Sequence, residues 1–238
     1  MITTILENNQ GFLWILTVIL DLSFAVTMYR WFGRYGLYGT IIFSLVMANI
    51  QGPKLTIIFG LQTSMGVILY SSIFFATDLL SEKYGRDEAQ RAVMLGFTVN
   101  VMLVVFSQLS ILYLPSTSSE TMVYATSVHQ ALVVIFSYTP RFVFGSLLAY
   151  LLSQSFDVWV YHRIKQATKD KYLWLRNTGS TVLSQAVDTL IYGLVVWWGI
   201  VDLHTALQLA GVKYLFKIII AILDTPFIYA ARSWPVRI

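Results

Sequence analysis

The strongest constraint in this sequence is a series of long apolar runs that recur from residue 12 to residue 231. A helix needs about 20 apolar residues to cross the hydrocarbon core of a bilayer. Only 12% of the residues are charged, against about 25% in an ordinary soluble domain. The sequence therefore predicts an all-α polytopic membrane protein that forms one transmembrane domain over residues 1–238. The predicted spans are residues 12–31, 36–60, 63–82, 88–113, 138–162, 175–200 and 206–231.

Basic residues alternate between the connections that join these spans. One set of connections is basic, and it holds Arg30, Arg34, Lys83, Arg86, Arg91, Arg163, Lys165, Lys169, Lys171, Arg176, Arg232 and Arg237. The opposite set, with the N-terminus and the near-neutral connection 114–137, is poor in Lys and Arg. Cytoplasmic connections carry the excess of basic residues. The pattern predicts a multi-pass protein of the inner (cell) membrane, with its N-terminus outside and its C-terminus in the cytoplasm.

Several kinds of chemistry have no signature in the sequence. There is no cysteine, and the three histidines lack a zinc-like spacing, so we expect no metal and no cofactor. The sequence contains no H-E-x-x-H, no G-x-S-x-G and no P-loop. We therefore expect a protein that is not an enzyme, although a catalytic pair among Asp78, Asp157 and Asp188 is an alternative.

Polar residues nevertheless lie inside the predicted spans, where a charge at the helix centre costs about 2.5–3.5 kcal/mol. Three spans each carry a polar stripe at helical spacing. The stripes are Gln154, Asp157 and Tyr161; Gln185, Asp188 and Tyr192; and Lys213, Lys217 and Asp224. One interpretation is that the stripes meet around a ligand or ion path, with Lys217 balancing Asp188 or Asp157. The other is that these groups hold the helices together structurally.

Two further stretches attract attention. Asp78 and Glu82 lie one helical turn apart at the end of a span. Asp78 is the site candidate, whereas Glu82 is expected to be solvated or paired with Lys83 or Arg86. Gly52 and Pro53 follow Asn49 and interrupt an apolar run, as in the broken helices that line substrate sites or as at an ordinary helix end.

Several segments carry recognisable patterns. They are FATDLLSEKYG (Phe75–Gly85), GSLLAYLLSQSFDVWVYHRIK (Gly145–Lys165) and RNTGSTVLSQAVDTLIY (Arg176–Tyr192), with Asn49–Lys54 before them and KYLFKIIIAILDTPFIY (Lys213–Tyr229) after them. In this order they resemble the queuosine precursor transporter family, also called the vitamin uptake transporter group. The resemblance covers residues 45–231, and the first helix, with Asp21, lies outside it.

The resemblance implies a six-helix core that works without an ATPase module, here with an extra N-terminal helix. It also implies import of 7-deazaguanines (preQ0, preQ1 or queuine) across the cytoplasmic membrane for tRNA modification. A carboxylate can accept the N1–H and 2-amino donors of such a base. We assign this role to Asp188 or Asp157, contact with the O6 side to Gln154, Gln185 or Asn49, and stacking to Tyr192 or Phe216. The full set of expected substrate-binding residues is Asn49, Asp78, Arg141, Gln154, Asp157, Gln185, Asp188, Tyr192, Phe216 and Lys217.

Other functions remain open from the sequence. The protein could carry or bind another flat nutrient, such as a vitamin or a nucleobase, in the manner of an S component. A membrane enzyme and a structural membrane subunit are further alternatives. The expected partners are a small-molecule substrate and the lipid bilayer, with no nucleic acid, and a homo-oligomer is left open.

Overall fold

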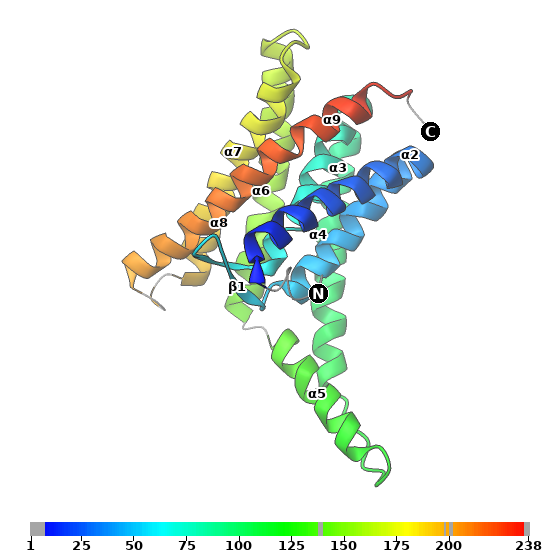
Figure 1. Ribbon diagram of the computed structural model, residues 1–238, viewed down its shortest axis with the longest axis vertical. Coiled ribbons are helices and arrows are strands. Elements are labelled where there is room, and N and C mark those ends of the chain that lie inside the picture. The colour runs from blue at the N-terminus through cyan, green and yellow to red at the C-terminus, as the bar shows by residue number, and fades with distance from the viewer. Residues whose placement is uncertain (1–7, 138–139, 198, 200–201, 236–238) are drawn as a thin grey trace.

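The computed structural model describes residues 8–137, 140–197, 199 and 202–235, which form a bundle of long helices (Figure 1). The elements in chain order are α2 (Gln10–Gln51), β1 (Leu55–Ile58), β2 (Leu61–Ser64), the 3₁₀ turn η1 (Met65–Val67), α3 (Tyr70–Lys83), α4 (Arg86–Leu112), α5 (Met122–Phe136), α6 (Pro140–Ala167), α7 (Leu173–Tyr192), the π-helical turn η2 (Gly193–Trp197), α8 (Leu203–Leu223) and α9 (Thr225–Arg232). The predicted end of a span at residue 200, and Arg237, lie outside the described residues.

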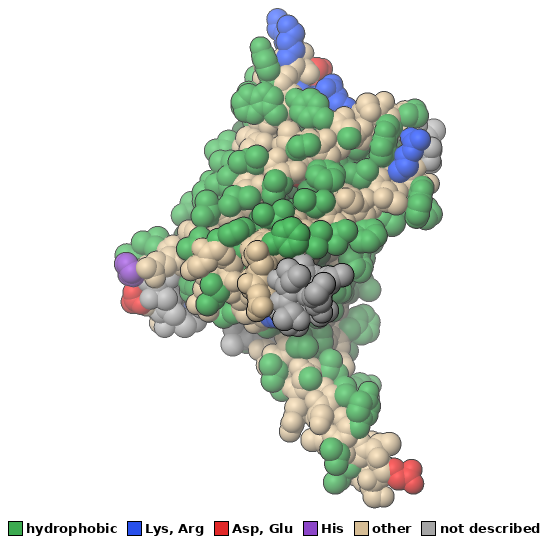
Figure 2. Space-filling view, viewed as in Figure 1, with side chains coloured by type: hydrophobic (Ala, Val, Ile, Leu, Met, Phe, Trp, Pro, Cys, Tyr) green, Lys and Arg blue, Asp and Glu red, His purple; other side chains and the backbone are tan. Residues whose placement is uncertain are grey.

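Six helical segments of the described residues are long and apolar enough to cross a membrane. The first, α2, folds back on itself, so that it forms two legs and the number of potential crossings is about seven (Figure 1). Hydrophobic side chains cover the visible flank of the bundle, and most of the visible Lys and Arg side chains gather toward one end (Figure 2). The all-α polytopic membrane fold predicted from the sequence is confirmed.

Two glycines make the reversal of α2 possible. Gly33 has φ 58° and ψ −135°, a conformation that side chains disfavour. A Cβ atom at Gly36 would lie 2.1 Å from the carbonyl oxygen of Met28 on the opposite leg. The two legs therefore approach each other too closely for any side chain at residue 36.

Helix α3 is the centre of the bundle. It packs against α2, α4, α6, α8 and α9, and 83% of the span that contains it is buried. Its start is capped from another helix, because Asp21 Oδ2 accepts hydrogen bonds from Ser71 Oγ at 2.6 Å and from the Ser72 backbone N–H at 3.0 Å. The first N–H groups of a helix have no partner within the helix. Asp21, whose role the sequence left open, thus caps α3.

The predicted spans 36–60 and 63–82 are wrong over residues 55–64. These residues form a β-hairpin in which Leu55 pairs with Ser64 and Ile58 with Leu61. The two-residue turn, Phe59 and Gly60, has positive φ angles of 52° and 77°, as type I′ hairpin turns require.

The local sequence explains this difference. Helix α2 ends at Gln51, directly before Gly52 and Pro53, and Pro53 cannot donate a backbone hydrogen bond. The next residues, Thr56, Ile57 and Ile58, are β-branched and favour a strand. Their apolar character alone made them resemble the continuation of a span.

Two further segments differ from expectation. The connection 114–137 contains α5, which projects from the bundle and has no buried residue (Figure 1). The predicted span 206–231 is divided at Asp224 into α8 and α9. Pro226 lies in the first turn of α9, where its missing N–H is tolerated at the start of a new helix.

The substitution Gly36→Ala tests the close approach of the two legs of α2. We expect the free energy of unfolding to fall by about 1–3 kcal/mol, because the new methyl group must push backbone atoms apart. The measurement is thermal unfolding of the purified protein in detergent. Gly39→Ala is the matched control, since its Cβ would meet only the Met28 Cε atom at 3.4 Å. Equal unfolding temperatures for the two variants would contradict the predicted close packing.

Candidate functional site

A cavity of about 510 Å³ lies among the helices at the hairpin end of the bundle. This volume falls within the range of small-molecule pockets, about 300–1,000 Å³. Its walls come from the end of α2, from β2, from the start of α3 and from α6, α7 and α8. The polar and aromatic lining residues are Asn49, Gln62, Thr63, Ser64, Tyr70, Ser137, Phe142, Ser146, Asp188, Thr189, Tyr192, Lys213 and Lys217.

An ion pair between α7 and α8 forms one wall of the cavity. Lys217 Nζ donates hydrogen bonds to Asp188 Oδ2 and to Gln185 Oε1, both at 2.6 Å. The Lys217 side chain is only 4% exposed, whereas that of Asp188 is 17% exposed. The other oxygen of Asp188, Oδ1, receives only a long hydrogen bond of 3.4 Å from Ser153. The carboxylate is therefore held by a buried cation and still has an oxygen available to a ligand.

Aromatic rings and a second lysine complete the polar wall. Lys217 Nζ lies 4.6 Å from the centroid of the Tyr70 ring, and Lys213 Nζ lies 4.3 Å from that of Tyr192. Phe142 meets Tyr192 edge to face, with 6.0 Å between the ring centroids. Among the described residues, Lys213 makes no ion pair and no hydrogen bond. The cavity thus offers flat apolar surfaces beside one carboxylate and two ammonium groups.

Asn49 lies at the end of α2 and is held by its neighbours. Its Nδ2 group donates to the Leu45 carbonyl at 2.8 Å and to Asn100 Oδ1 at 2.9 Å. Ser64 Oγ of the hairpin donates to the Gly52 carbonyl at 2.7 Å, which attaches β2 to the broken end of α2. The Gly52–Pro53 interruption therefore shapes the cavity wall.

The other expected site residues lie in different places. Gln185 contacts Lys217 directly. Gln154 is buried, and its Oε1 atom has no hydrogen-bond partner in the described part of the chain. Phe216 does not line the cavity and packs against Trp14, with ring centroids 5.2 Å apart. Arg141 is exposed near the start of α6 and donates to the Val195 carbonyl.

Asp78 and Asp157 also lie outside the cavity lining, deeper in the bundle. Asp157 Oδ1 accepts a hydrogen bond of 2.8 Å from Ser184, one turn along α7 from Asp188. Asp78, on α3, faces Asp157. The predicted polar stripes do meet, but they form successive layers instead of surrounding a single space.

Sequence reasoning missed two parts of the cavity. Tyr70 is the first residue of α3, two turns before Asp78, and Asp78 itself lies outside the cavity, so the polar pattern of this span gave no signal for Tyr70. The hairpin was missed because its apolar strands were assigned to spans, and Phe59-Gly60 is not one of the dipeptides that mark a two-residue hairpin turn in a sequence.

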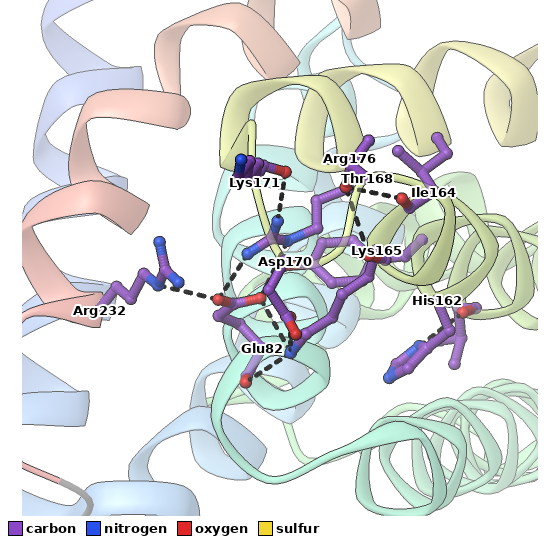
Figure 3. Close-up of polar contacts among 11 residues, drawn as sticks. Glu82, His162, Ile164, Lys165, Thr168, Asp170, Lys171, Arg176 and Arg232 are labelled. Atoms are coloured by element: carbon purple, nitrogen blue, oxygen red, sulfur yellow. Dashed lines mark hydrogen bonds and ion pairs between the residues drawn. The ribbon is translucent and has the colours of Figure 1, made fainter.

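At the opposite end of the bundle, Glu82 connects four helices (Figure 3). Arg176 of α7 binds it in a bidentate manner, with Nη2–Oε1 at 2.7 Å and Nε–Oε2 at 3.0 Å. Arg232 of α9 lies 2.9 Å from Oε1, and Lys165 of α6 lies 3.3 Å from Oε2. The Tyr161 hydroxyl donates to Oε2 at 3.0 Å. We call these five residues the Glu82 cluster.

The expectation that Glu82 is solvated or pairs with Lys83 or Arg86 is wrong. Its side chain is 4% exposed, and its cationic partners come from distant segments that no local pattern reveals. Lys83 instead donates to the carbonyl groups of Ala231, in the last turn of α9, and of Trp234, just after that helix. Contacts from α3, α6, α7 and α9 therefore close this end of the bundle.

Membrane-spanning helices that surround an ion-paired pocket, closed at one end by a salt-bridge cluster, have the architecture of a small-molecule transporter. The comparisons with known proteins agree. A family model described as putative vitamin uptake transporter matches residues 64–231. The chain belongs to this family, as the resemblance had implied. It is accordingly a non-enzymatic, multi-pass transport protein of the cell membrane.

Two curated relatives carry more specific names. The chain is 39% identical over 226 residues to the "Probable queuosine precursor transporter" of Bacillus subtilis (strain 168), covering 94% of this chain and 95% of that protein. It is 29% identical over 168 residues to the "Queuosine precursor transporter" of Escherichia coli (strain K12), covering 69% and 70% of the two chains. No solved structure matches the chain significantly.

The substitution Glu82→Gln tests the Glu82 cluster. We expect it to lower the free energy of unfolding by about 3–5 kcal/mol, because it leaves the buried Arg176 without a counter-charge. Glu88→Gln is the control, since Glu88 pairs with Arg34 and Arg91 near the surface, where such pairs contribute about 0.2–1 kcal/mol. Thermal unfolding in detergent measures both. A loss for Glu82→Gln no larger than for Glu88→Gln would show that the cluster does not hold this end together.

Proposed function

We propose that this chain imports queuosine precursors, 7-deazaguanines such as preQ0, preQ1 or queuine, across the cytoplasmic membrane for tRNA modification. The names of the relatives support this substrate class. The observation that supports particular residues is the partly exposed Asp188 carboxylate, which lines the same cavity as the rings of Tyr70 and Tyr192. A flat base that has two adjacent N–H donors on one edge is complementary to this arrangement.

In the proposed pose, Asp188 accepts the N1–H and 2-amino hydrogens of the base. Tyr70 and Tyr192 are the rings available for stacking, worth about 1–3 kcal/mol per base. Lys213 carries N–H donors that suit the O6 atom, whereas the Asn49 amide N–H groups are occupied by Leu45 and Asn100. Lys217 neutralises Asp188 when the pocket is empty.

The charge of the lining favours one precursor over the others. Two lysines, Lys213 and Lys217, face a single lining aspartate, Asp188. A basic amine on the ligand, as in preQ1 and queuine, would meet this positive charge in a largely buried site. The nitrile of preQ0 carries no charge. We therefore propose preQ0 as the preferred substrate.

The basic ends of the helices support the orientation of the chain. Lys165 belongs to the Glu82 cluster (Figure 3), Lys83 follows Glu82 directly, and Arg34 pairs with Glu88 at the adjacent start of α4, so all three lie at this end of the bundle. By the positive-inside rule this end faces the cytoplasm. The pocket then lies toward the outside, and the cluster closes the route to the cytoplasm.

The test is expression in cells that neither make nor import queuosine precursors. preQ0, preQ1 and queuine are supplied separately, and queuosine in tRNA is measured. The intact chain is expected to restore queuosine, at the lowest external concentration with preQ0. Failure with every precursor would refute the proposed function.

The substitution Asp188→Asn tests the role of this carboxylate in binding. The amide that replaces it is an uncharged hydrogen-bond acceptor, so the affinity for preQ0 is expected to fall about tenfold to a hundredfold. Binding to the purified protein is measured together with queuosine formation at matched membrane levels. Asp87→Asn, at an exposed position in the first turn of α4, is the control and is expected to be unchanged. Normal binding by Asp188→Asn would exclude the proposed pose.

A further inference from the structure

A layer of three carboxyl groups lies between the pocket and the Glu82 cluster. Asp78 comes from α3, Asp157 from α6, and Asp224 from the junction of α8 and α9. Their exposed fractions are 1%, 4% and 0%. None of the three forms an ion pair with any described residue. We call these residues the acidic layer.

The nearby cations are bound to other partners. Lys217 pairs with Asp188 on the pocket side, and Arg176 pairs with Glu82 on the other side. A carboxylate buried without a counter-charge is strongly disfavoured in a bilayer, and such groups mark proton and ion pathways in transporters. The acidic layer therefore needs a positive charge that the described side chains do not supply.

Hydrogen bonds satisfy only part of the layer. Ser184 donates to Asp157 Oδ1 at 2.8 Å, and Asn177 Nδ2 donates to Asp224 Oδ1 at 2.7 Å. Both oxygens of Asp78, Oδ2 of Asp224 and Oδ1 of Asn177 are buried and meet no donor in the described part of the chain. These are unsatisfied acceptors, and what they lack is a hydrogen.

The carboxyl groups of Asp78 and Asp157 lie within hydrogen-bonding reach of each other. Two carboxylates have only acceptors, so a hydrogen bond between them requires a proton on one of them. Two adjacent buried aspartates share a proton because both cannot remain charged. The described residues hold no group of three or more acidic or histidine side chains arranged to bind a metal ion.

The titratable groups around the pair come from several helices. Asp224 and Glu82 face Asp78, and so does Tyr161 of α6. Asp224 also faces Asp157. These neighbours are acidic or phenolic. Glu82 is paired with cations, and the Arg176 guanidinium lies 5.9 Å from the centroid of the Tyr161 ring.

The position of the layer connects it to transport. Along α7, Asp188 lines the pocket, Ser184 holds Asp157, Asn177 holds Asp224, and Arg176 binds Glu82. At 1.5 Å per residue, this series covers about 18 Å of helix axis. A change in the proton content of the layer therefore acts between the substrate and the closed end.

We propose that the Asp78–Asp157 pair binds the proton that couples this transporter to the proton gradient. One proton enters from the pocket side, is held between the two carboxyl groups while substrate is bound, and leaves to the cytoplasm when the Glu82 cluster opens. A neutral substrate and one proton then cross together, so each cycle carries one positive charge inward. This inference rests on the proposed transport function.

The experiment uses the full chain in liposomes with labelled preQ0 outside. A gradient of about one pH unit, acidic outside, is imposed with the membrane potential clamped. For one proton per substrate we expect about tenfold accumulation at equilibrium, because one pH unit corresponds to a factor of ten. A pH-sensitive dye inside the vesicles should report acidification when preQ0 is added.

Asp78→Asn separates the proton from the substrate. The amide keeps the size of the side chain and cannot be ionised, so preQ0 binding and exchange of internal for external preQ0 are expected to remain. Accumulation driven by the pH gradient and the acidification should be lost. Asp157→Asn should behave in the same way, and Asp87→Asn should retain all activities.

The outcomes distinguish the two proposals. If wild-type protein equilibrates preQ0 but never concentrates it, or if a sodium gradient drives accumulation instead, the proton site is refuted and the transport function stands. If wild-type protein neither binds nor moves preQ0, the proposed function fails and the inference fails with it. Because these outcomes use the wild-type chain, they do not depend on how well the variants fold.

Discussion

The high cost of charge in hydrocarbon is the constraint on which the rest of this structure depends. A bilayer supplies no water to an ammonium or carboxylate group, so each must meet another part of the protein. Lys217 meets Asp188 and Gln185, and Arg176 meets Glu82 at two atoms. These contacts fix the positions of α3, α7 and α8, and they divide the polar interior into separate levels.

The polar interior has three successive levels, which are the pocket, the acidic layer and the Glu82 cluster. Helices α3, α6 and α7 and the α8–α9 pair all contribute to them. Helix α3 supplies Tyr70, Asp78 and Glu82 in this order, and α7 supplies Asp188, Ser184 and Arg176. Helix α6 adds Ser146, Asp157 and Tyr161, while α8 and α9 add Lys217, Asp224 and Arg232. Because α3, α6 and α7 each take part in all three levels, a displacement of one of these helices changes the pocket, the acidic layer and the Glu82 cluster together. This linkage is what a carrier needs to alternate between its two faces.

Much of this could be predicted from the sequence, and the rest could not for physical reasons. Apolar length and helical spacing were sufficient for the spans and for the stripes that carry Asp157, Asp188 and Lys217, since both depend on local periodicity. Periodicity shows which face of a helix a residue occupies, but it does not show at what height along the bundle axis that residue meets a neighbouring helix. The stripes were therefore placed around one cavity, although they form successive levels. The cationic partners of Glu82 come from segments more than eighty residues away. Phe216 faces Trp14 because of the path of α2.

The cap that Asp21 places on α3 has a consequence for where the functional unit begins. The family model starts at residue 64, yet the first hydrogen bonds of α3 are completed by a carboxylate from the preceding α2 leg. A chain shortened to the matched region would leave the Ser72 backbone N–H and the Ser71 hydroxyl without this acceptor. The first leg of α2 thus completes the start of the central helix, and the folding unit extends to the amino-terminal side of the region that the family model matches.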